Sequence, residues 1–251
     1  MKKIFLVFIS TMLILSCRNI ENDNKEILNK DSSSSIIPDS SIIISQVLTK
    51  DQQDKLTPDQ VIQSLVEGNE DFVNDLLTVR NNSRRVREAA LGQYPTAVIL
   101  SCLDSRIPVE DVFHMGIGDL FVARVAGNIV NEDILGSLEY ACKVSGSKLI
   151  VVMGHEYCGA IKSAIDGVKL GNITALLSKI NPAVQYIQDS LKTKGSSGDA
   201  GFVDLVCREN VELGIQNIRK LSPVLREMEK KGEIKIIGSV YHMKSGKVDF
   251  F

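Results

Sequence analysis

The chain has 251 residues, with 29 Lys and Arg, 31 Asp and Glu, and a formal net charge of -2 at pH 7. This near-neutral balance leaves no excess positive charge to hold a phosphate backbone, which argues against general nucleic-acid binding. A hydrophobic fraction of 44% excludes a wholly disordered chain, and five cysteines in a chain of this length are too few for a small disulfide-stapled scaffold.

Residues 1–16 are predicted to be a signal peptide. Lys2 and Lys3 precede an apolar stretch at residues 4–15, which is shorter than the roughly 20 residues that a membrane-spanning helix needs. The following Ser16-Cys17 resembles the end of the lipobox of bacterial lipoproteins, in which the cysteine becomes the lipid-modified N-terminus after cleavage. The resemblance implies an exported protein anchored by Cys17 at the bacterial cell envelope, on the periplasmic or surface side. An ordinary secretory signal or an uncleaved one is the alternative.

Residues 17–56 are predicted to form a flexible tether. Their composition is rich in Asn, Asp, Glu, Lys and Ser, with a short apolar patch at residues 42–44. Such a segment buries too little apolar surface to offset the entropy of ordering it. The folded domain is therefore predicted to span residues 57–251. Thr57-Pro58-Asp59-Gln60 has the pattern of a capping box, and the apolar spacing that follows predicts a helix as far as about Leu76.

The rest of the domain predicts an α/β fold with a mainly parallel β-sheet flanked by helices, an N-terminal helical arm and a C-terminal hairpin. Apolar runs of strand length at residues 96–103, 120–125 and 148–153 are typical of strands covered on both faces. A further strand is predicted at 234–241, and helices at 131–144, 173–191 and 202–231. Lys244-Ser245-Gly246-Lys247 predicts a hairpin turn into a last strand. In open parallel sheets, sites lie beyond the carboxyl ends of the strands.

Two predicted strand ends carry metal-binding residue types. Cys102 lies at the end of the first strand, and His155 and Cys158 follow the third. Two thiols and an imidazole are a known catalytic zinc set that leaves a fourth position open. A His three residues before a Cys is a weak signal by itself, because a lone His is more often a hydrogen-bonded core or surface residue. A third ligand, Cys102, at a second strand end favours the zinc interpretation.

Asp104 and Arg106 lie just beyond the first of these cysteines. Opposite charges this close in sequence commonly form a structural ion pair on a loop. The functional interpretation is that Asp104 accepts a hydrogen bond from a zinc-bound water, or takes the fourth zinc position itself in a closed state. Arg106 then fixes the direction of the carboxylate through paired N–H donors.

Three segments closely resemble the signature segments of the β-class carbonic anhydrases. They are Cys102-Leu103-Asp104-Ser105-Arg106, Arg124-Val125-Ala126-Gly127-Asn128 and Gly154-His155-Glu156-Tyr157-Cys158-Gly159. The similarity extends from about residue 57 to the C-terminal hairpin. It implies one Zn2+ per subunit, held by Cys102, His155 and Cys158, with Asp104 and Arg106 as the catalytic dyad.

The resemblance also implies a substrate pocket and an oligomer. Gln93, Phe121 and Tyr140 fall where family members line the pocket, and Gly159 offers a backbone amide beside it. Ala126 stands where many plant relatives carry Val, which implies a slightly roomier pocket like that of bacterial members. Family members form homodimers that exchange N-terminal helices, often pairing into homotetramers, with the active site at the dimer interface.

The implied function is the reversible hydration of carbon dioxide to bicarbonate and a proton by zinc-bound hydroxide. Zinc can lower the pKa of bound water from about 15.7 to about 7, a figure known from a carbonic anhydrase with three histidine ligands. Two thiolates place more negative charge on the metal than imidazoles do, so this site is expected to lower the pKa of its bound water less. We therefore expect the hydration rate to rise toward alkaline pH in stopped-flow measurements; a rate that stays flat from about pH 6 to 9 contradicts this expectation.

Two other functions fit the same residues. The first is hydrolysis of carbonyl sulfide or carbon disulfide on the same scaffold, since related enzymes use the same metal set. The second is a noncatalytic zinc-binding surface protein. Asp104 and Arg106 argue against this last function, because a closed structural zinc site needs no poised carboxylate.

The remaining cysteines and histidines have simpler interpretations. Cys142 and Cys207 are predicted to be buried free thiols, although an exported location also permits a disulfide between them. His114 and His242 are predicted to be surface or packing residues rather than zinc ligands.

Overall fold

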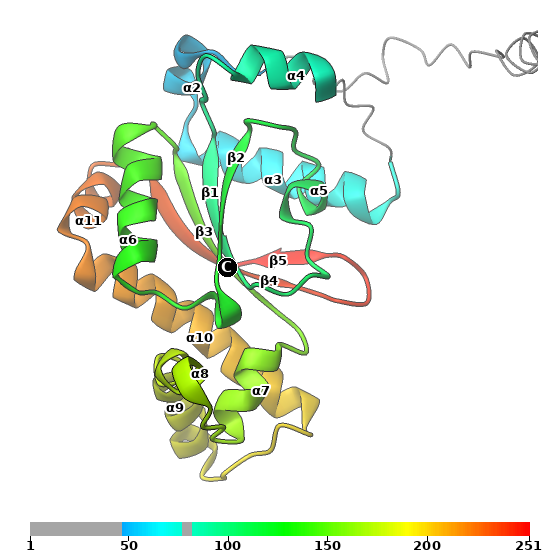
Figure 1. Ribbon diagram of the computed structural model, residues 1–251, viewed down its shortest axis with the longest axis vertical. Coiled ribbons are helices and arrows are strands. Elements are labelled where there is room, and N and C mark those ends of the chain that lie inside the picture. Colours follow the sequence, from blue (N-terminus) through cyan, green and yellow to red (C-terminus); the bar gives the residue numbers. More distant parts are fainter. Residues whose placement is uncertain (1–46, 77–81) are drawn as a thin grey trace, which may run out of the picture. The chain divides into compact units, whose positions relative to one another are not determined.

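A computed structural model describes residues 47–76 and 82–251 of the chain (Figure 1). The predicted signal peptide, Cys17 and most of the predicted tether lie outside the described residues. Within the described ranges, every helix is too short or too polar to cross a membrane.

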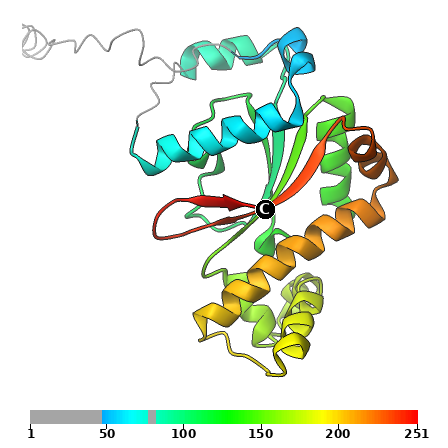
Figure 2. The ribbon, with the colours of Figure 1, turned by 180° about the vertical axis from the view of Figure 1, so that it is seen from behind.

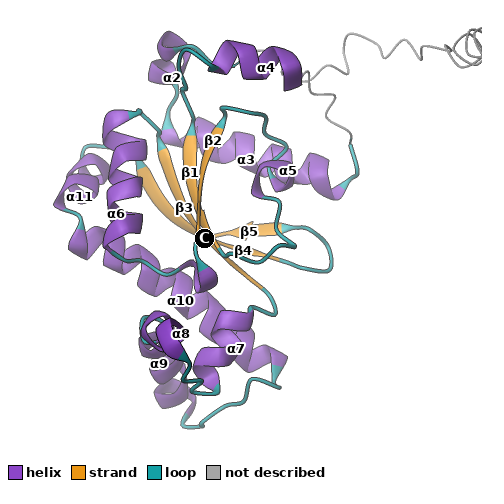
Figure 3. Ribbon diagram, in the orientation of Figure 1, coloured by secondary structure: helices purple, strands orange, loops and turns teal. Residues whose placement is uncertain are grey.

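Five strands form one sheet in the order β2-β1-β3-β4-β5. β1 (Ala97–Ser101), β2 (Leu120–Arg124), β3 (Leu149–His155) and β4 (Lys235–Tyr241) are parallel, and β5 (Val248–Phe250) pairs antiparallel with β4 (Figure 3). Every residue of β1 and β3 is buried, as expected for strands covered on both faces. The predicted α/β class, the parallel sheet and the C-terminal hairpin are confirmed.

Helices cover both faces of the sheet (Figures 1 and 2). On one face, α3 (Pro58–Val73) and α5 (Val109–Val112) pack with Ala97 and Ile99 of β1. On the other, α6 (Glu132–Glu139), the π-helical turn η3 (Tyr140–Val144), α10 (Ala200–Leu221) and α11 (Pro223–Lys230) pack with Val98 and Leu100. This alternation along one strand produces two separate hydrophobic cores.

A third hydrophobic cluster lies beyond the carboxyl ends of the strands. It gathers α7 (Gly159–Ile165), α8 (Gly171–Leu177), α9 (Asn181–Leu191) and the first half of α10. Cys102 and Cys158 belong to this cluster. The cluster therefore encloses the edge of the sheet where the sequence predicts the metal site.

One described helix lies inside the predicted tether. α2 (Lys50–Lys55) lies inside the expected tether, and Thr49 begins it with a capping box. The side-chain amide of Gln53, which is fully buried, donates to the carbonyls of Pro95 and Ser145, at 2.8 and 2.9 Å. These bonds tie α2 to the loops that precede β1 and β3. Residues 50–55, which were predicted to lie in the tether, therefore belong to the folded part of the chain.

Two of the predicted long helices are each two helices. The stretch 173–191 contains α8 and α9, and the stretch 202–231 contains α10 and α11. Pro182 lies in the first turn of α9 and Pro223 in that of α11. Proline lacks the N–H that the interior of a helix needs, so a new helix begins at or next to each of these prolines. The apolar spacing continues across both breaks, which is why it predicted one long helix in each case.

A buried ion pair ties α4 (Asn82–Ala89) to the start of β2. Arg85 is fully buried, and its guanidinium contacts the Asp119 carboxylate and donates to the carbonyl of Ile117. The other carboxylate oxygen of Asp119 accepts the N–H of Gly116 at 2.8 Å. The ion pair thus fixes α4, which has few apolar residues of its own, against the sheet.

Candidate metal centre

Three side chains converge beyond the carboxyl ends of β1 and β3. Cys102 follows β1, His155 ends β3, and Cys158 lies in the turn before α7. All three are buried, and their candidate ligand atoms lie within 4.8 Å of one another. The two Sγ atoms are 3.9 Å apart. Within residues 47–76 and 82–251, this is the one group of at least three such ligands, and it contains the three predicted ones.

His155 presents a ring nitrogen with a lone pair to this group. Its Nδ1 lies 2.9 Å from the backbone oxygen of Glu156. Because a carbonyl only accepts, Nδ1 carries the proton and Nε2 keeps the lone pair. Nε2 is buried and finds no hydrogen-bond partner among the described residues. Leaving a buried polar atom unsatisfied costs about 1–3 kcal/mol, and a metal ion at this atom removes that cost.

The two thiols interact with each other. Hydrogen bonding with Cys158 lowers the pKa of the Cys102 thiol to about 4, although burial opposes the shift. The same pairing, together with burial, raises the pKa of Cys158. A thiol binds a metal ion as the thiolate, so a cation bound between these two side chains displaces their protons. Two thiolates and an imidazole are the donor set that zinc prefers, so the residues present fit a zinc ion.

Tyr157 shapes the turn between two of these residues. Its φ of 57° lies in the left-handed region, which residues other than glycine rarely adopt. The Lys162 ammonium lies over its ring, 5.8 Å from the centroid. The left-handed residue turns the chain sharply between His155 and Cys158, so both side chains face the same group.

Asp104 and Arg106 form the predicted pair. Arg106 donates from Nε to Oδ1 at 2.9 Å and from its terminal nitrogen to Oδ2 at 2.7 Å, and its backbone N–H reaches Oδ1 at 3.0 Å. These bonds lower the pKa of the Asp104 carboxyl to about 2. Asp104 is therefore a carboxylate at neutral pH that only accepts hydrogen bonds. It is held by Arg106 and stands outside the group of three candidate ligands.

Three further residues support the site, and no role was predicted for them. Arg124 donates to the carbonyl of Cys102 at 3.0 Å and to that of Asp104. The N–H of Gly127 donates to Sγ of Cys102 at 3.3 Å, and Asn210 of α10 donates to the carbonyl of Gly127 at 2.9 Å. Arg124 and Gly127 lie in one of the three segments that resemble the β-class carbonic anhydrases, and this resemblance was the signal in the sequence that pointed to them. Nothing in the helical pattern distinguishes Asn210.

Replacing Gly127 with Ala is expected to destabilise the protein by about 1–3 kcal/mol. Gly127 has a φ of 70°, and an added Cβ would lie 2.6 Å from Cδ1 of Ile180. Urea unfolding of the full chain measures the effect. Gly201→Ala is the matched control, because its added Cβ would lie 3.4 Å from the Asp199 carboxylate, an ordinary contact. Equal unfolding midpoints for the two variants contradict the prediction.

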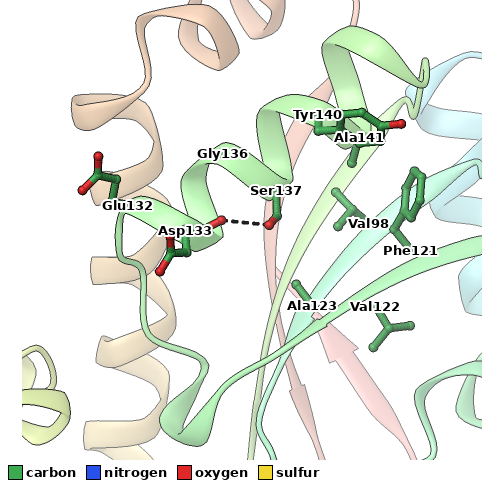
Figure 4. Close-up of a pocket in the computed structure, with 10 residues that line it drawn as sticks. All are labelled: Val98, Phe121, Val122, Ala123, Glu132, Asp133, Gly136, Ser137, Tyr140 and Ala141. Carbon is green, nitrogen blue, oxygen red and sulfur yellow. Dashed lines mark hydrogen bonds between the residues drawn. The ribbon is translucent and has the colours of Figure 1, made fainter. Parts of the chain in front are cut away.

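Phe121 and Tyr140 lie apart from the metal group of their own chain. Phe121 pairs in register with Val98, near the start of β1, whereas Cys102 follows the end of that strand. The two rings meet edge-to-face with centroids 6.5 Å apart, and they line a cavity of about 580 Å³ between β2 and α6 (Figure 4). Gln93 is exposed on the loop before β1. Of the four predicted pocket residues, Gly159 alone is a chain neighbour of a ligand.

Cys142 and Cys207 are buried free thiols, as predicted. Burial raises the pKa of each to about 12. The Cys207 thiol donates to the backbone oxygen of His155 at 3.3 Å. Neither thiol belongs to the candidate ligand group.

Comparison with known proteins identifies relatives of this chain. Residues 97–248 match the family model described as carbonic anhydrase. The chain is 33% identical over 186 residues to carbonic anhydrase 2 of Mycobacterium tuberculosis, covering 74% of this chain and 88% of that protein. It is 31% identical over 188 residues to the carbonic anhydrase of Mycolicibacterium smegmatis, covering 74% and 90%.

Solved structures share the fold as well. A tetrameric β-carbonic anhydrase of Sordaria macrospora superposes with a TM-score of 0.62 at 26% identity, covering 68% of this chain and 87% of that one. A Coccomyxa β-carbonic anhydrase in complex with acetazolamide gives 0.61 at 26% identity, covering 76% and 86%. With a family model that spans more than half of its length and relatives that align over most of theirs, the chain belongs to the carbonic anhydrase family, in its β class.

Proposed function

We propose that Cys102, His155 and Cys158 hold the zinc ion of this carbonic anhydrase, which hydrates carbon dioxide reversibly to bicarbonate and a proton. The convergence of the three ligand atoms, with Nε2 of His155 otherwise unsatisfied, carries the proposal. When bound, zinc supplies a Lewis acid that makes hydroxide available from water near neutral pH.

Asp104 orients the attacking water by accepting its hydrogen bond. A carboxylate has about four lone-pair sites. Arg106 occupies two on Oδ1 and one on Oδ2, so Oδ2 keeps one for the water. Gly159 lies in the first turn of α7, where backbone N–H groups have no partner within the helix. We assign this N–H the role of donating to a substrate oxygen beside Cys158.

The test measures carbon dioxide hydration and bound zinc on the same sample of the full chain by stopped flow. The rate is expected to follow zinc occupancy. Asp104→Ala is expected to lower the rate by about 100-fold while retaining zinc, because the variant no longer orients the water. Asp166→Ala, an exposed carboxylate at the end of α7, is the control and is expected to keep the wild-type rate.

Full zinc occupancy without carbon dioxide hydration, even at alkaline pH, would contradict this function. The same sample is then assayed with carbonyl sulfide and carbon disulfide. Turnover of either favours the sulfur-substrate hydrolase, and no turnover favours a structural zinc site.

The active protein is further proposed to be a homodimer, or a homotetramer of paired dimers, in which Gln93, Phe121 and Tyr140 of one copy complete the site of another. Phe121 and Tyr140 line an open cavity away from their own metal group, and Tyr140 keeps 52% of its surface exposed. The related Sordaria macrospora protein is tetrameric. Light scattering that finds a monomer contradicts the proposal.

Export and lipid anchoring through Cys17 complete the proposed function. The support is the basic start, the short apolar stretch and the Ser16-Cys17 ending, all in the sequence. Cys17→Ser, expressed in bacteria, is expected to move the protein out of the membrane fraction and to abolish incorporation of labelled fatty acid. A variant that stays in the membrane fraction contradicts the anchor.

A further inference from the structure

Hydrogen bonds from the β4–β5 hairpin hold Glu156, the residue that follows the candidate ligand His155. The backbone N–H of Glu156 donates to the carbonyl of Tyr241 at 3.2 Å. Its carboxylate accepts the backbone N–H of Met243 at 2.9 Å and lies 3.1 Å from Nδ1 of His242. Its backbone oxygen in turn accepts Nδ1–H of His155 at 2.9 Å. The residue is thus held at both its backbone and its side chain.

His242 is itself held from the other side. Its Nε2 lies 2.8 Å from Oδ2 of Asp249 on β5, and the other oxygen of Asp249 contacts Lys247 at 2.7 Å. Burial lowers the pKa of His242, but its bonds to Glu156 and Asp249 outweigh that effect and raise it. Asp204 of α10 also faces this cluster, where burial and the charge of Glu156 raise its own pKa. Each ring nitrogen of His242 thus faces a carboxylate.

The geometry points to Glu156 and His242 as positioning residues for His155. The hairpin fixes the backbone carbonyl of Glu156, which accepts the hydrogen bond from Nδ1–H of His155. That hydrogen bond keeps Nε2 of His155 directed at the two thiols. Rotation of that peptide would release the imidazole, and the Glu156 carboxylate, held by Met243 and His242, opposes the rotation. This inference rests on the zinc site proposed above.

Outer partners of this kind affect how tightly a metal is held. A ligating histidine normally donates its other N–H to an acceptor that fixes the tautomer and the ring orientation, and loss of such a partner typically costs about 10–100-fold in metal affinity. Without the His242 ring, the Glu156 carboxylate keeps the Met243 N–H and loses its contact with Nδ1 of His242. Zinc is then expected to leave about 10-fold faster.

Three substitutions at one position separate this role from hairpin stability. His242→Ala removes both ring nitrogens. His242→Asn places an amide nitrogen near the position of Nδ1, which faces Glu156, and His242→Gln places one near Nε2, which faces Asp249. The zinc-loaded full chain is mixed with excess chelator, and the release rate is followed with a zinc indicator. The unfolding temperature is recorded for each variant.

The Ala and Gln variants are expected to release zinc about 10-fold faster than the wild type, and the Asn variant at close to the wild-type rate. The absorption spectrum of the cobalt-loaded chain, which reports the metal's ligand geometry, is expected to change in the same order. His114→Asn is the matched control, because His114 also pairs with a carboxylate, Asp71 at 3.2 Å, but on α3, which carries no candidate ligand. Its release rate is expected to match the wild type.

Two results overturn the inference while leaving the zinc site in place. One is a wild-type release rate in His242→Ala. The other is equal acceleration in the Asn and Gln variants, which would mean that the hairpin's stability and not the bond to Glu156 controls zinc release. Failure of the wild-type chain to bind zinc overturns the proposed site itself.

Discussion

Cys102→Ser is expected to lose its zinc and to hydrate carbon dioxide more than about 100-fold more slowly than the wild type, since even outer partners of a ligand cost about 10–100-fold. The substitution keeps nearly the same shape, and the new hydroxyl can still accept the N–H of Gly127, which lies 3.3 Å from Sγ. It removes the thiolate. A serine hydroxyl stays protonated at neutral pH, whereas hydrogen bonding with Cys158 lowers the pKa of the Cys102 thiol to about 4.

Cys142→Ser is the control for this substitution. Cys142 is also a buried free thiol, but burial raises its pKa to about 12 and it lies outside the ligand group. Zinc content per chain and the stopped-flow rate are measured on both variants. The control is expected to keep the zinc of the wild type. Full zinc and full activity in Cys102→Ser would remove this residue from the ligand set.

The sequence was most informative where local rules decide the structure. Strands covered on both faces need continuous apolar residues, so β1 and β3 could be recognised from composition alone. Parallel strands bring their carboxyl ends to one edge, and this brought Cys102 and His155 together although 53 positions separate them. The strand pattern therefore predicts that these side chains meet, and the resemblance to the β-class carbonic anhydrases identified them as a zinc ligand set.

The features of the fold and the site that the sequence did not predict depend on contacts between residues far apart in the chain. α2 is fixed by the Gln53 amide, whose acceptors lie 42 and 92 positions away, and no local pattern reveals such a bond. Asn210 reaches Gly127 across 83 positions for the same reason. Phe121 and Tyr140 were predicted as pocket residues by resemblance alone, and one chain keeps them apart from the ligands.

Asp119→Ala is expected to destabilise the protein by about 3–5 kcal/mol, because it removes a carboxylate from the fully buried Arg85 guanidinium. It also takes an acceptor from the N–H of Gly116. Urea unfolding of the full chain, followed by circular dichroism, measures the loss. Asp59→Ala is the control, because its ion pair with Lys235 is exposed on both sides, and it is expected to cost less than about 1 kcal/mol.

A double substitution tests whether the buried charge is the cause. In Arg85→Met with Asp119→Asn, the charge is gone from both positions, the methionine fills apolar space, and the asparagine oxygen can still accept the N–H of Gly116. Removing one partner of a buried ion pair leaves an uncompensated charge, whereas the double variant leaves none, so it is expected to be more stable than Asp119→Ala. If it is less stable, α4 is held chiefly by the bonds of Arg85 to Ile117, and the electrostatic explanation is wrong.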